Sequence, residues 1–209
     1  SAFRFVEQVI SSFSDDENTS LFLFATGLEL FVKARLFREH WSLIFANIDQ
    51  AEFQRFSSGK LITVGAEKAH DRIRRIVGHT LPDSFGELRE HRNRIAHYTH
   101  GNSAEERIEI ISHQLRGWYD LYHLLRHEWK PEFKQYRRRA SDLERKMRQH
   151  REFLDTKFQA IQSSLQREHE AGHEIHNCPA CRYAAMGVWL INGSIYQGNC
   201  RVCRPSWPE

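Results

Sequence analysis

The chain has 209 residues, of which 40% are apolar and 27% are charged, a composition typical of soluble globular proteins. Thirty Lys and Arg against 27 Asp and Glu give a formal charge of only +3. This net charge does not by itself indicate nucleic-acid binding, so the distribution of the basic residues matters more. The best apolar run, residues 21–32, is too short to cross a bilayer and contains Glu29, so we expect no membrane-spanning segment.

All four cysteines follow residue 177. No signal-peptide pattern precedes the first predicted helix, so a reducing cytoplasm is the expected location. In that compartment a cysteine cluster indicates a metal site rather than disulfides.

Two apolar segments predict helices over residues 3–13 and 21–37. The second has apolar residues on nearly every side, which places it in a hydrophobic core. Glu29 and Lys33 interrupt it at i, i+4 spacing, which is typical of an ion pair within one helix. A second interpretation makes Glu29 the partner of Arg92, and both interpretations can hold together.

Residues 40–59 predict a connecting region rather than a long regular helix. Four aromatic residues anchor it: Trp41, Phe45, Phe53 and Phe56. A helical pattern returns over 65–77 and ends at the segment 78–82, which contains a glycine and a proline.

The next helix carries the hexapeptide Arg92-Asn93-Arg94-Ile95-Ala96-His97. Ser84 and Glu87 have the spacing of a capping box and predict where this helix begins. Four apolar residues share one side of the helical wheel: Phe85, Leu88, Ile95 and Ala96. Arg92 lies in the middle of this stripe. Because burial of an unpaired charge is costly, we expect Arg92 to meet a carboxylate, a second subunit or a phosphate.

Two further helices follow. Ser103 and Glu106 form a second capping box, which predicts a helix that runs to about Glu128. Pro131 suits the first turn of a helix, and neither glycine nor proline occurs again before Gly172. The sequence therefore predicts one unbroken helix here, with apolar residues stepping by threes and fours as in a coiled coil or a long packing helix.

Basic residues gather between positions 130 and 151, where nine Lys or Arg stand against three acids. Five of them are the candidates for contact with nucleic acid: Arg137, Arg138, Arg139, Arg145 and Lys146. One interpretation is a solvated helix face. The other is a ridge that follows phosphates, whose binding would weaken steeply with salt.

The C-terminal segment carries the most specific chemical pattern. Cys178-Pro179-Ala180-Cys181 and Cys200-Arg201-Val202-Cys203 are two Cys-x-x-Cys pairs separated by eighteen residues, the spacing of a four-cysteine zinc site. Residues 188–191 and 194–196 flank Asn192-Gly193, a strong hairpin signal. Four thiolates leave no open position on a tetrahedral zinc ion, so the predicted metal is structural and not catalytic.

The expected fold is therefore all-α with one small β element. A helical bundle over residues 1–130 is followed by a long basic, coiled-coil-like helix over 131–173. A zinc ribbon with a β-hairpin completes the chain over 174–209.

Arg92, Asn93 and His97 have the chemistry that RNA cleavage needs. A histidine with a near-neutral pKa moves protons, and an arginine holds a phosphate and stabilises its charge in the transition state. No acidic cluster suited to a catalytic Mg²⁺ is evident nearby in the sequence. The residues fit metal-independent cleavage, in which a 2′-hydroxyl attacks the adjacent phosphate. A purely structural interpretation, with Asn93 as a cap and His97 at the helix end, stays open.

The hexapeptide resembles the R-x4-H signature of HEPN-domain ribonucleases, in the form with Asn after Arg. Residues 27–34 are similar to an early helix of many bacterial members, and the resemblance covers roughly residues 1–130. It implies an α-helical bundle that forms a homodimer with its two motifs facing each other. Arg92 and His97 would then be catalytic, Asn93 would orient them and Glu29 would support Arg92. Cleavage would leave a 2′,3′-cyclic phosphate.

The same resemblance implies a bacterial toxin or anti-phage defence effector that acts on RNA. A regulatory or antitoxin partner chain is a further expectation. The alternative is a non-catalytic protein for nucleic-acid binding or dimerisation, which would use the basic helix and the zinc ribbon. Cleavage of RNA in EDTA separates the two hypotheses.

Overall fold

The computed structural model describes residues 2–11, 17–97, 104–191, 195–203 and 206–208. The protein is mostly helical, with a small antiparallel sheet near the C-terminus, so the coarse fold class predicted from the sequence is confirmed. The chain divides into two compact units, residues 1–143 and 144–209.

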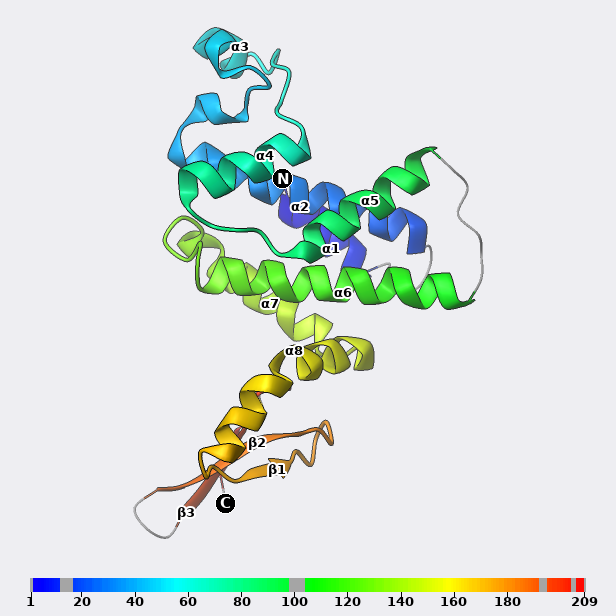
Figure 1. Ribbon diagram of the computed structural model, residues 1–209, viewed down its shortest axis with the longest axis vertical. Helices are drawn as coiled ribbons and strands as arrows, with labels where there is room; N and C mark the ends of the chain where they lie inside the picture. Colours follow the sequence, from blue (N-terminus) through cyan, green and yellow to red (C-terminus); the bar gives the residue numbers. More distant parts are fainter. Residues whose placement is uncertain (1, 12–16, 98–103, 192–194, 204–205, 209) are drawn as a thin grey trace. The chain divides into compact units, whose positions relative to one another are not determined.

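The first unit is a set of packed helices around α2 (Figure 1). Its main helices are α1 (Ala2–Ser11), α2 (Glu17–Glu39), α4 (Ala66–Arg72), α5 (Asp83–His97) and α6 (Ala104–Arg126). Each of the other four contacts α2. Seven apolar side chains of α2 are buried: Leu21, Phe24, Ala25, Leu28, Phe31, Val32 and Leu36. The prediction of a core helix in this segment is therefore confirmed.

A glycine allows α6 to approach its neighbours closely. A Cβ at Gly117 of α6 would overlap the side chain of Leu88 from α5 and would lie 3.1 Å from Phe24 of α2. Leu88 and Phe24 are themselves buried. The missing side chain thus sets the distance at which the three helices pack.

The connection between α2 and α5 is built from short elements. These are η1 (Trp41–Ile44), η2 (Ile48–Gln50), α3 (Phe53–Ser57) and, after α4, the π-helical turn η3 (Ile73–Val77). The ring of Trp41 lies 5.5–5.8 Å from those of Phe45, Phe53 and Phe56, as expected of aromatic anchors. Arg72 ties α4 to this connection, because its guanidinium donates to the carbonyls of residues 43 and 45.

The predicted capping box at the start of α5 is wrong. The helix begins at Asp83, so Ser84 lies inside its first turn. The hydroxyl of Ser84 donates to Asp120 of α6 at 2.6 Å, and Glu87 contacts α6 as well. Contacts to a neighbouring helix replace the local cap. At the start of α6, Ser103 and the side chain of Glu106 lie outside the described residues.

The predicted unbroken helix after Pro131 is also wrong. The segment forms η4 (Lys134–Tyr136), α7 (Arg137–Met147) and α8 (Arg151–Glu170), with a break at residues 148–150. At the break, Arg148 and Arg151 donate to the backbone carbonyls of Cys203 and Cys181. These tertiary contacts outweigh the local helix preference, and no glycine or proline marks the position.

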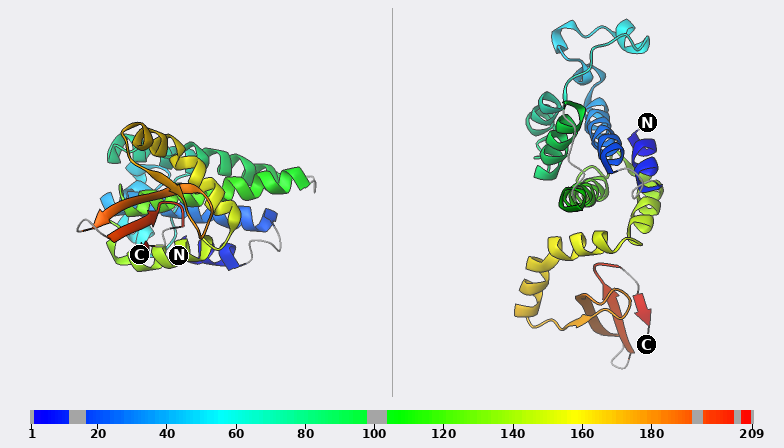
Figure 2. Two further views of the ribbon diagram at one scale, coloured as in Figure 1. Left: turned by 90° about the horizontal axis from the view of Figure 1, so that it is seen from below. Right: turned by 90° about the vertical axis from the view of Figure 1, so that its right-hand side faces the viewer.

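The second unit combines α8 with an antiparallel sheet (Figure 2). Its strands are β1 (Ile175–Asn177), β2 (Ala184–Ile191), β3 (Ile195–Cys200) and β4 (Ser206–Pro208), adjacent in chain order. β2 pairs with β3 from Met186↔Cys200 to Ile191↔Ile195, which confirms the predicted hairpin. Asn192 and Gly193 themselves lie outside the described residues.

Helix α8 supplies part of the core of this second unit. Its residues Leu154 and Leu165 form one buried cluster with three of the cysteines, Tyr183, Ala185 and Val202. A sheet of this size has few apolar side chains of its own, so it buries them against a helix. The boundary between the two units, at residues 143 and 144, places α8 in the same unit as the sheet. The sequence analysis had instead assigned residues 131–173 to a separate connecting helix.

Candidate functional site

Arg92 lies where the buried stripe of α5 reaches the surface. Phe85 and Leu88, in the first half of the stripe, are buried. Further along, Ile95 is half-buried and Ala96 is exposed. The Arg92 side chain is 22% exposed. The stripe predicted from the sequence is therefore covered only in its first half, and Arg92 stands at the transition.

The charge of Arg92 is paired with a carboxylate of α2. Arg92 Nη1 donates to Glu29 Oε2 at 2.8 Å. Glu29 also pairs with Lys33, whose Nζ lies 2.7 Å from Oε1. Both contacts expected of Glu29 are thus confirmed. The three charges sum to +1, so the group retains a net positive charge.

Asn93 holds the other side of the guanidinium. Its Oδ1 accepts from Arg92 Nη2 at 3.1 Å and from Nε at 3.3 Å. Together with Glu29, Asn93 fixes the plane of the guanidinium. His97 is the last residue of α5, one helical turn after Asn93, and its side chain lies outside the described residues.

The carboxyl of Glu29 stays ionised across the neutral range. Partial burial works to raise its pKa, but hydrogen bonds from Lys33 and Arg92 outweigh burial and hold the pKa below its usual value. An ionised Glu29 keeps Arg92 in place at physiological pH.

An open hollow of about 480 Å³ lies beside Arg92 and Asn93. Its lining comes from the start of α4 and the middle of α5: Gly65, Ala66, Glu67, Lys68, Arg89, Glu90, Arg92 and Asn93. Its three basic side chains outnumber its two acidic ones. This volume is within the usual range of small-molecule sites, and the cationic side chains suit an anionic group.

The sequence analysis did not identify two residues that lie near Arg92. His70 of α4 lines a small cavity with Glu29, Arg89 and Arg92. Burial, together with the charge of Arg89, lowers the pKa of His70 below its usual value, so the ring is neutral at pH 7. Arg89 precedes Arg92 by one helical turn, which helical spacing could have signalled. His70 arrives from a separate helix, and no spacing in the sequence indicates it.

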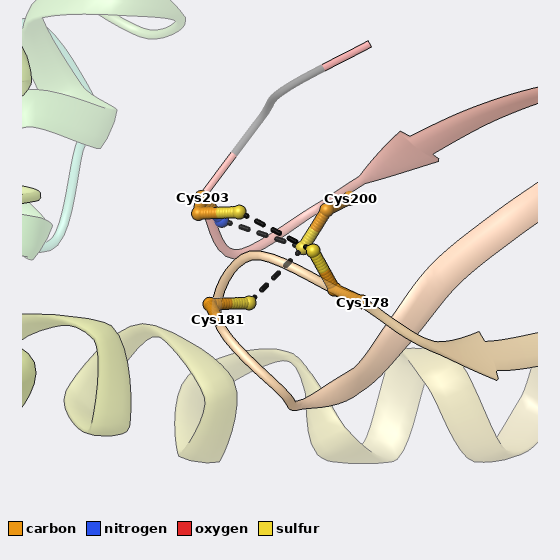
Figure 3. A group of neighbouring side chains, drawn as sticks. All are labelled: Cys178, Cys181, Cys200 and Cys203. Carbon is orange, nitrogen blue, oxygen red and sulfur yellow. Dashed lines mark hydrogen bonds between the residues drawn. The ribbon is translucent and has the colours of Figure 1, made fainter. Parts of the chain in front are cut away.

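The four cysteines form a single cluster at the open end of the hairpin of β2 and β3, one pair before β2 and the other at the end of β3 and just after it (Figure 3). Sγ of Cys178 lies 3.6 Å from that of Cys203, and Sγ of Cys181 lies 3.5 Å from that of Cys200. These separations are far too long for disulfide bonds. They match the edge of a tetrahedron with metal–sulfur bonds of about 2.3 Å.

Burial keeps two of the four thiols protonated when no metal is bound. Burial raises the pKa of Cys181 to about 11 and also raises that of Cys203. For Cys178, burial acts in the same direction, but backbone N–H groups of Cys181 and Ala180 lower the pKa overall. Metal binding needs thiolates, so an ion at this cluster would release protons as it binds. The fit to a closed metal site rests on the separations of the four sulfur atoms and on their number.

Basic side chains of the second unit bind the carbonyls of the cysteine loops. Arg148 Nη1 donates to Cys203 O and Arg151 Nη1 to Cys181 O, both at 2.7 Å. Lys157, which is buried, donates to Val202 O and pairs with Glu144 at 3.1 Å. Part of the basic segment predicted to contact nucleic acid thus has a structural role.

All five residues predicted to contact nucleic acid lie on α7. Arg137, Arg138, Arg145 and Lys146 are exposed. Arg139 instead forms a bidentate pair with Glu7 of α1, at 2.5 and 2.6 Å. Four of the five side chains therefore remain reachable from solvent.

No family model, curated protein or solved structure matches this chain. Within the described ranges, none of the helices has the length and apolar character needed to span a bilayer.

Proposed function

We propose that this protein is a metal-independent endoribonuclease of the HEPN type. The observation that carries the proposal is the Arg92 guanidinium, held between Glu29 and Asn93 beside an open cationic hollow. An arginine fixed in this way is preorganised for a phosphate, because its side chain is already ordered before the phosphate binds. The R-x4-H spacing from Arg92 to His97 supports the same assignment.

The proposed reaction is an internal transesterification of RNA. The 2′-oxygen attacks the adjacent phosphorus, the bond from phosphorus to the 5′-oxygen breaks, and a 2′,3′-cyclic phosphate and a 5′-hydroxyl result. A base takes the proton of the 2′-hydroxyl, and an acid returns one to the leaving 5′-oxygen. His97 has the chemistry for one of these transfers, and Arg92 stabilises the charge on the phosphate.

A homodimer is part of the proposal. Ile95 and Ala96 continue the apolar stripe of α5 beyond the part that the bundle covers. A second copy packed on this part of α5 would bring two Arg92 and two His97 residues to one composite site. We also propose that the four cysteines hold a structural Zn²⁺ and that catalysis needs no metal.

The experiment is cleavage of single-stranded RNA in EDTA, with analysis of the product ends. We expect wild type to leave 2′,3′-cyclic phosphates. Arg92→Ala and His97→Ala should each reduce the rate at least ~100-fold, the usual effect of removing one group that stabilises transition-state charge. Arg75→Ala, which removes an exposed arginine of η3, is the matched control and should cleave normally. Unchanged cleavage by both site variants would exclude the proposal.

The second candidate function is binding of nucleic acid without cleavage. The exposed side chains Arg137, Arg138, Arg145 and Lys146 favour it. This function predicts binding that weakens steeply with salt, yields no product and is unaffected by His97→Ala.

The biological role that we propose with ribonuclease activity is a toxin or anti-phage defence effector, restrained by a regulatory or antitoxin partner chain. Expression of wild type in bacteria should then arrest growth, whereas Arg92→Ala should not. Arrest by both forms to the same degree would contradict this role. A cytoplasmic location stays a prediction from the sequence.

A further inference from the structure

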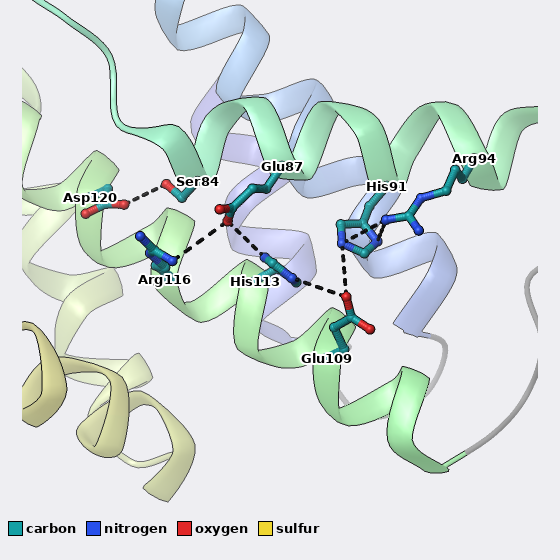
Figure 4. Close-up of polar contacts among 8 residues, drawn as sticks. All are labelled: Ser84, Glu87, His91, Arg94, Glu109, His113, Arg116 and Asp120. Carbon is teal, nitrogen blue, oxygen red and sulfur yellow. Dashed lines mark hydrogen bonds and ion pairs between the residues drawn. The ribbon is translucent and has the colours of Figure 1, made fainter.

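Two histidines and a glutamate converge between α5 and α6 (Figure 4). His91 comes from α5. Glu109 and His113 come from α6, and their i, i+4 spacing places both on the same face of that helix. One nitrogen of each ring and one oxygen of the carboxylate all lie within 4.8 Å of one another. Imidazole and carboxylate are ligands that divalent transition metals accept.

The distances are close to those of a metal site. Glu109 Oε1 lies 3.5 Å from Nε2 of His113 and 3.7 Å from Nε2 of His91. A tetrahedral ion with bonds of about 2.0–2.1 Å needs its ligand atoms about 3.4 Å apart. Small side-chain rotations would therefore bring all three atoms onto one ion.

A second carboxylate orients the ring of His113. Glu87 Oε2 lies 3.1 Å from His113 Nδ1, and the carboxylate can only accept. Nδ1 therefore donates to Glu87, and Nε2 is the ring nitrogen that faces Glu109. Metal-binding histidines commonly have such a carboxylate partner on their other nitrogen.

The cluster is fixed on one side and open on the other. His91 is only 5% exposed, whereas the Glu109 side chain is 56% exposed. Three protein ligands also leave a fourth position for water or another small ligand. An ion can thus enter from solvent along Glu109.

Arg94 is the group that a metal would displace. Its Nη2 lies 2.9 Å from Nδ1 and 3.1 Å from Nε2 of His91. The guanidinium donates to an unprotonated ring nitrogen, which is the form of His91 that binds metal. As an exposed cation, Arg94 also competes with an incoming ion.

We propose that His91, Glu109 and His113 bind a divalent transition metal of the zinc or cobalt class, which links α5 to α6. This site shares no residue with the four-cysteine cluster. It does not depend on the proposed ribonuclease activity, although it lies on the helix that carries Arg92.

The test is a titration of CoCl₂ into full-length protein whose cysteines already hold one equivalent of zinc. Calorimetry and visible absorption monitor the binding of cobalt. Wild type should bind one further equivalent. Glu109→Gln and His113→Gln should each weaken it at least ~10-fold, the scale of losses at metal sites. Glu109 is exposed, so its substitution leaves the fold intact. The matched control is His123→Gln with His127→Gln. It removes one other histidine of α6 and the histidine just after that helix, whose rings lie 4.5 Å apart, and this variant should still bind the further equivalent of cobalt.

The proposal is overturned if wild type takes up no cobalt beyond the cysteine site. It is also overturned if the further equivalent persists at full affinity in both site variants, or disappears in the control. Arg94→Gln should bind cobalt several-fold more tightly because the competing cation is gone. An affinity equal to or below that of wild type would contradict the geometry that we propose.

Discussion

The Arg92 site and the four-cysteine cluster are held in opposite ways. The cysteines come from two short segments at the open end of one hairpin, and three of the four are buried. Arg92 meets Glu29 and lies near His70, so three helices of the bundle assemble that site. We therefore expect the cluster to depend on the proposed metal ion, whereas the Arg92 site depends on helix packing. Each can be broken without the other.

Loss of a cysteine should have the largest effect. Cys200 is fully buried, and structural zinc commonly contributes about 10–16 kcal/mol to the folding of a small domain. We expect Cys200→Ser, or prolonged chelation, to abolish hydrogen-exchange protection in residues 144–209. The helices around α2 should keep their protection, because their own core does not include the cysteines.

His176→Gln is the control for this experiment. His176 lies close to the first cysteine pair but contacts only the exposed Glu174 among the interactions described for it. Its substitution should leave zinc content and exchange protection unchanged. Full protection of residues 144–209 in metal-free Cys200→Ser would show that the ribbon does not need its ion.

Removal of the carboxylate that pairs with Arg92 should have an intermediate effect. Glu29→Gln removes the negative charge that Arg92 and Lys33 share. We expect the free energy of unfolding to fall by about 1–2 kcal/mol, measured by urea denaturation followed through helical circular dichroism. Glu67→Gln removes an exposed carboxylate of α4 from the same hollow and should change stability by less than ~0.5 kcal/mol. Equal effects of the two substitutions would refute a specific role for Glu29.

The smallest effect should be on pH dependence. The pKa of Glu29 is lower in the folded protein than its ordinary value of 4.5, so the unfolded chain takes up this proton first on acidification. The stabilisation is complete above pH 4.5 and declines as the pH falls through the lowered pKa. The difference in free energy of unfolding between wild type and Glu29→Gln should therefore shrink as the pH falls from 4.5 through the lowered pKa. An advantage that grows on acidification would contradict the assigned direction.

The parts of the protein that sequence reasoning predicted correctly depend on short-range patterns or on one strong energetic rule. The cysteine spacing and the paired strands of the hairpin are local features. The Arg92 to Glu29 contact followed from the cost of burying an unpaired charge on an apolar stripe. Each needed only one element or one pair of elements.

The errors arose where distant contacts compete with local preference. The break before α8 depends on carbonyls of the cysteine loops, more than 25 residues away along the chain. Ser84 has the spacing of a cap, yet it donates to Asp120 of the next helix. His70 reaches the Arg92 site from α4, and its role depends on burial, which the sequence pattern does not reveal.

The contacts from Arg148, Arg151 and Lys157 to the cysteine loops define what can be moved as a module. A peptide cut at residue 174 would lose these three donors and the leucines of α8, so its loop carbonyls and apolar side chains would face water. A portable ribbon therefore begins near Glu144 and includes all of α8. In a fusion or a domain exchange, the helix has to travel with the cysteines.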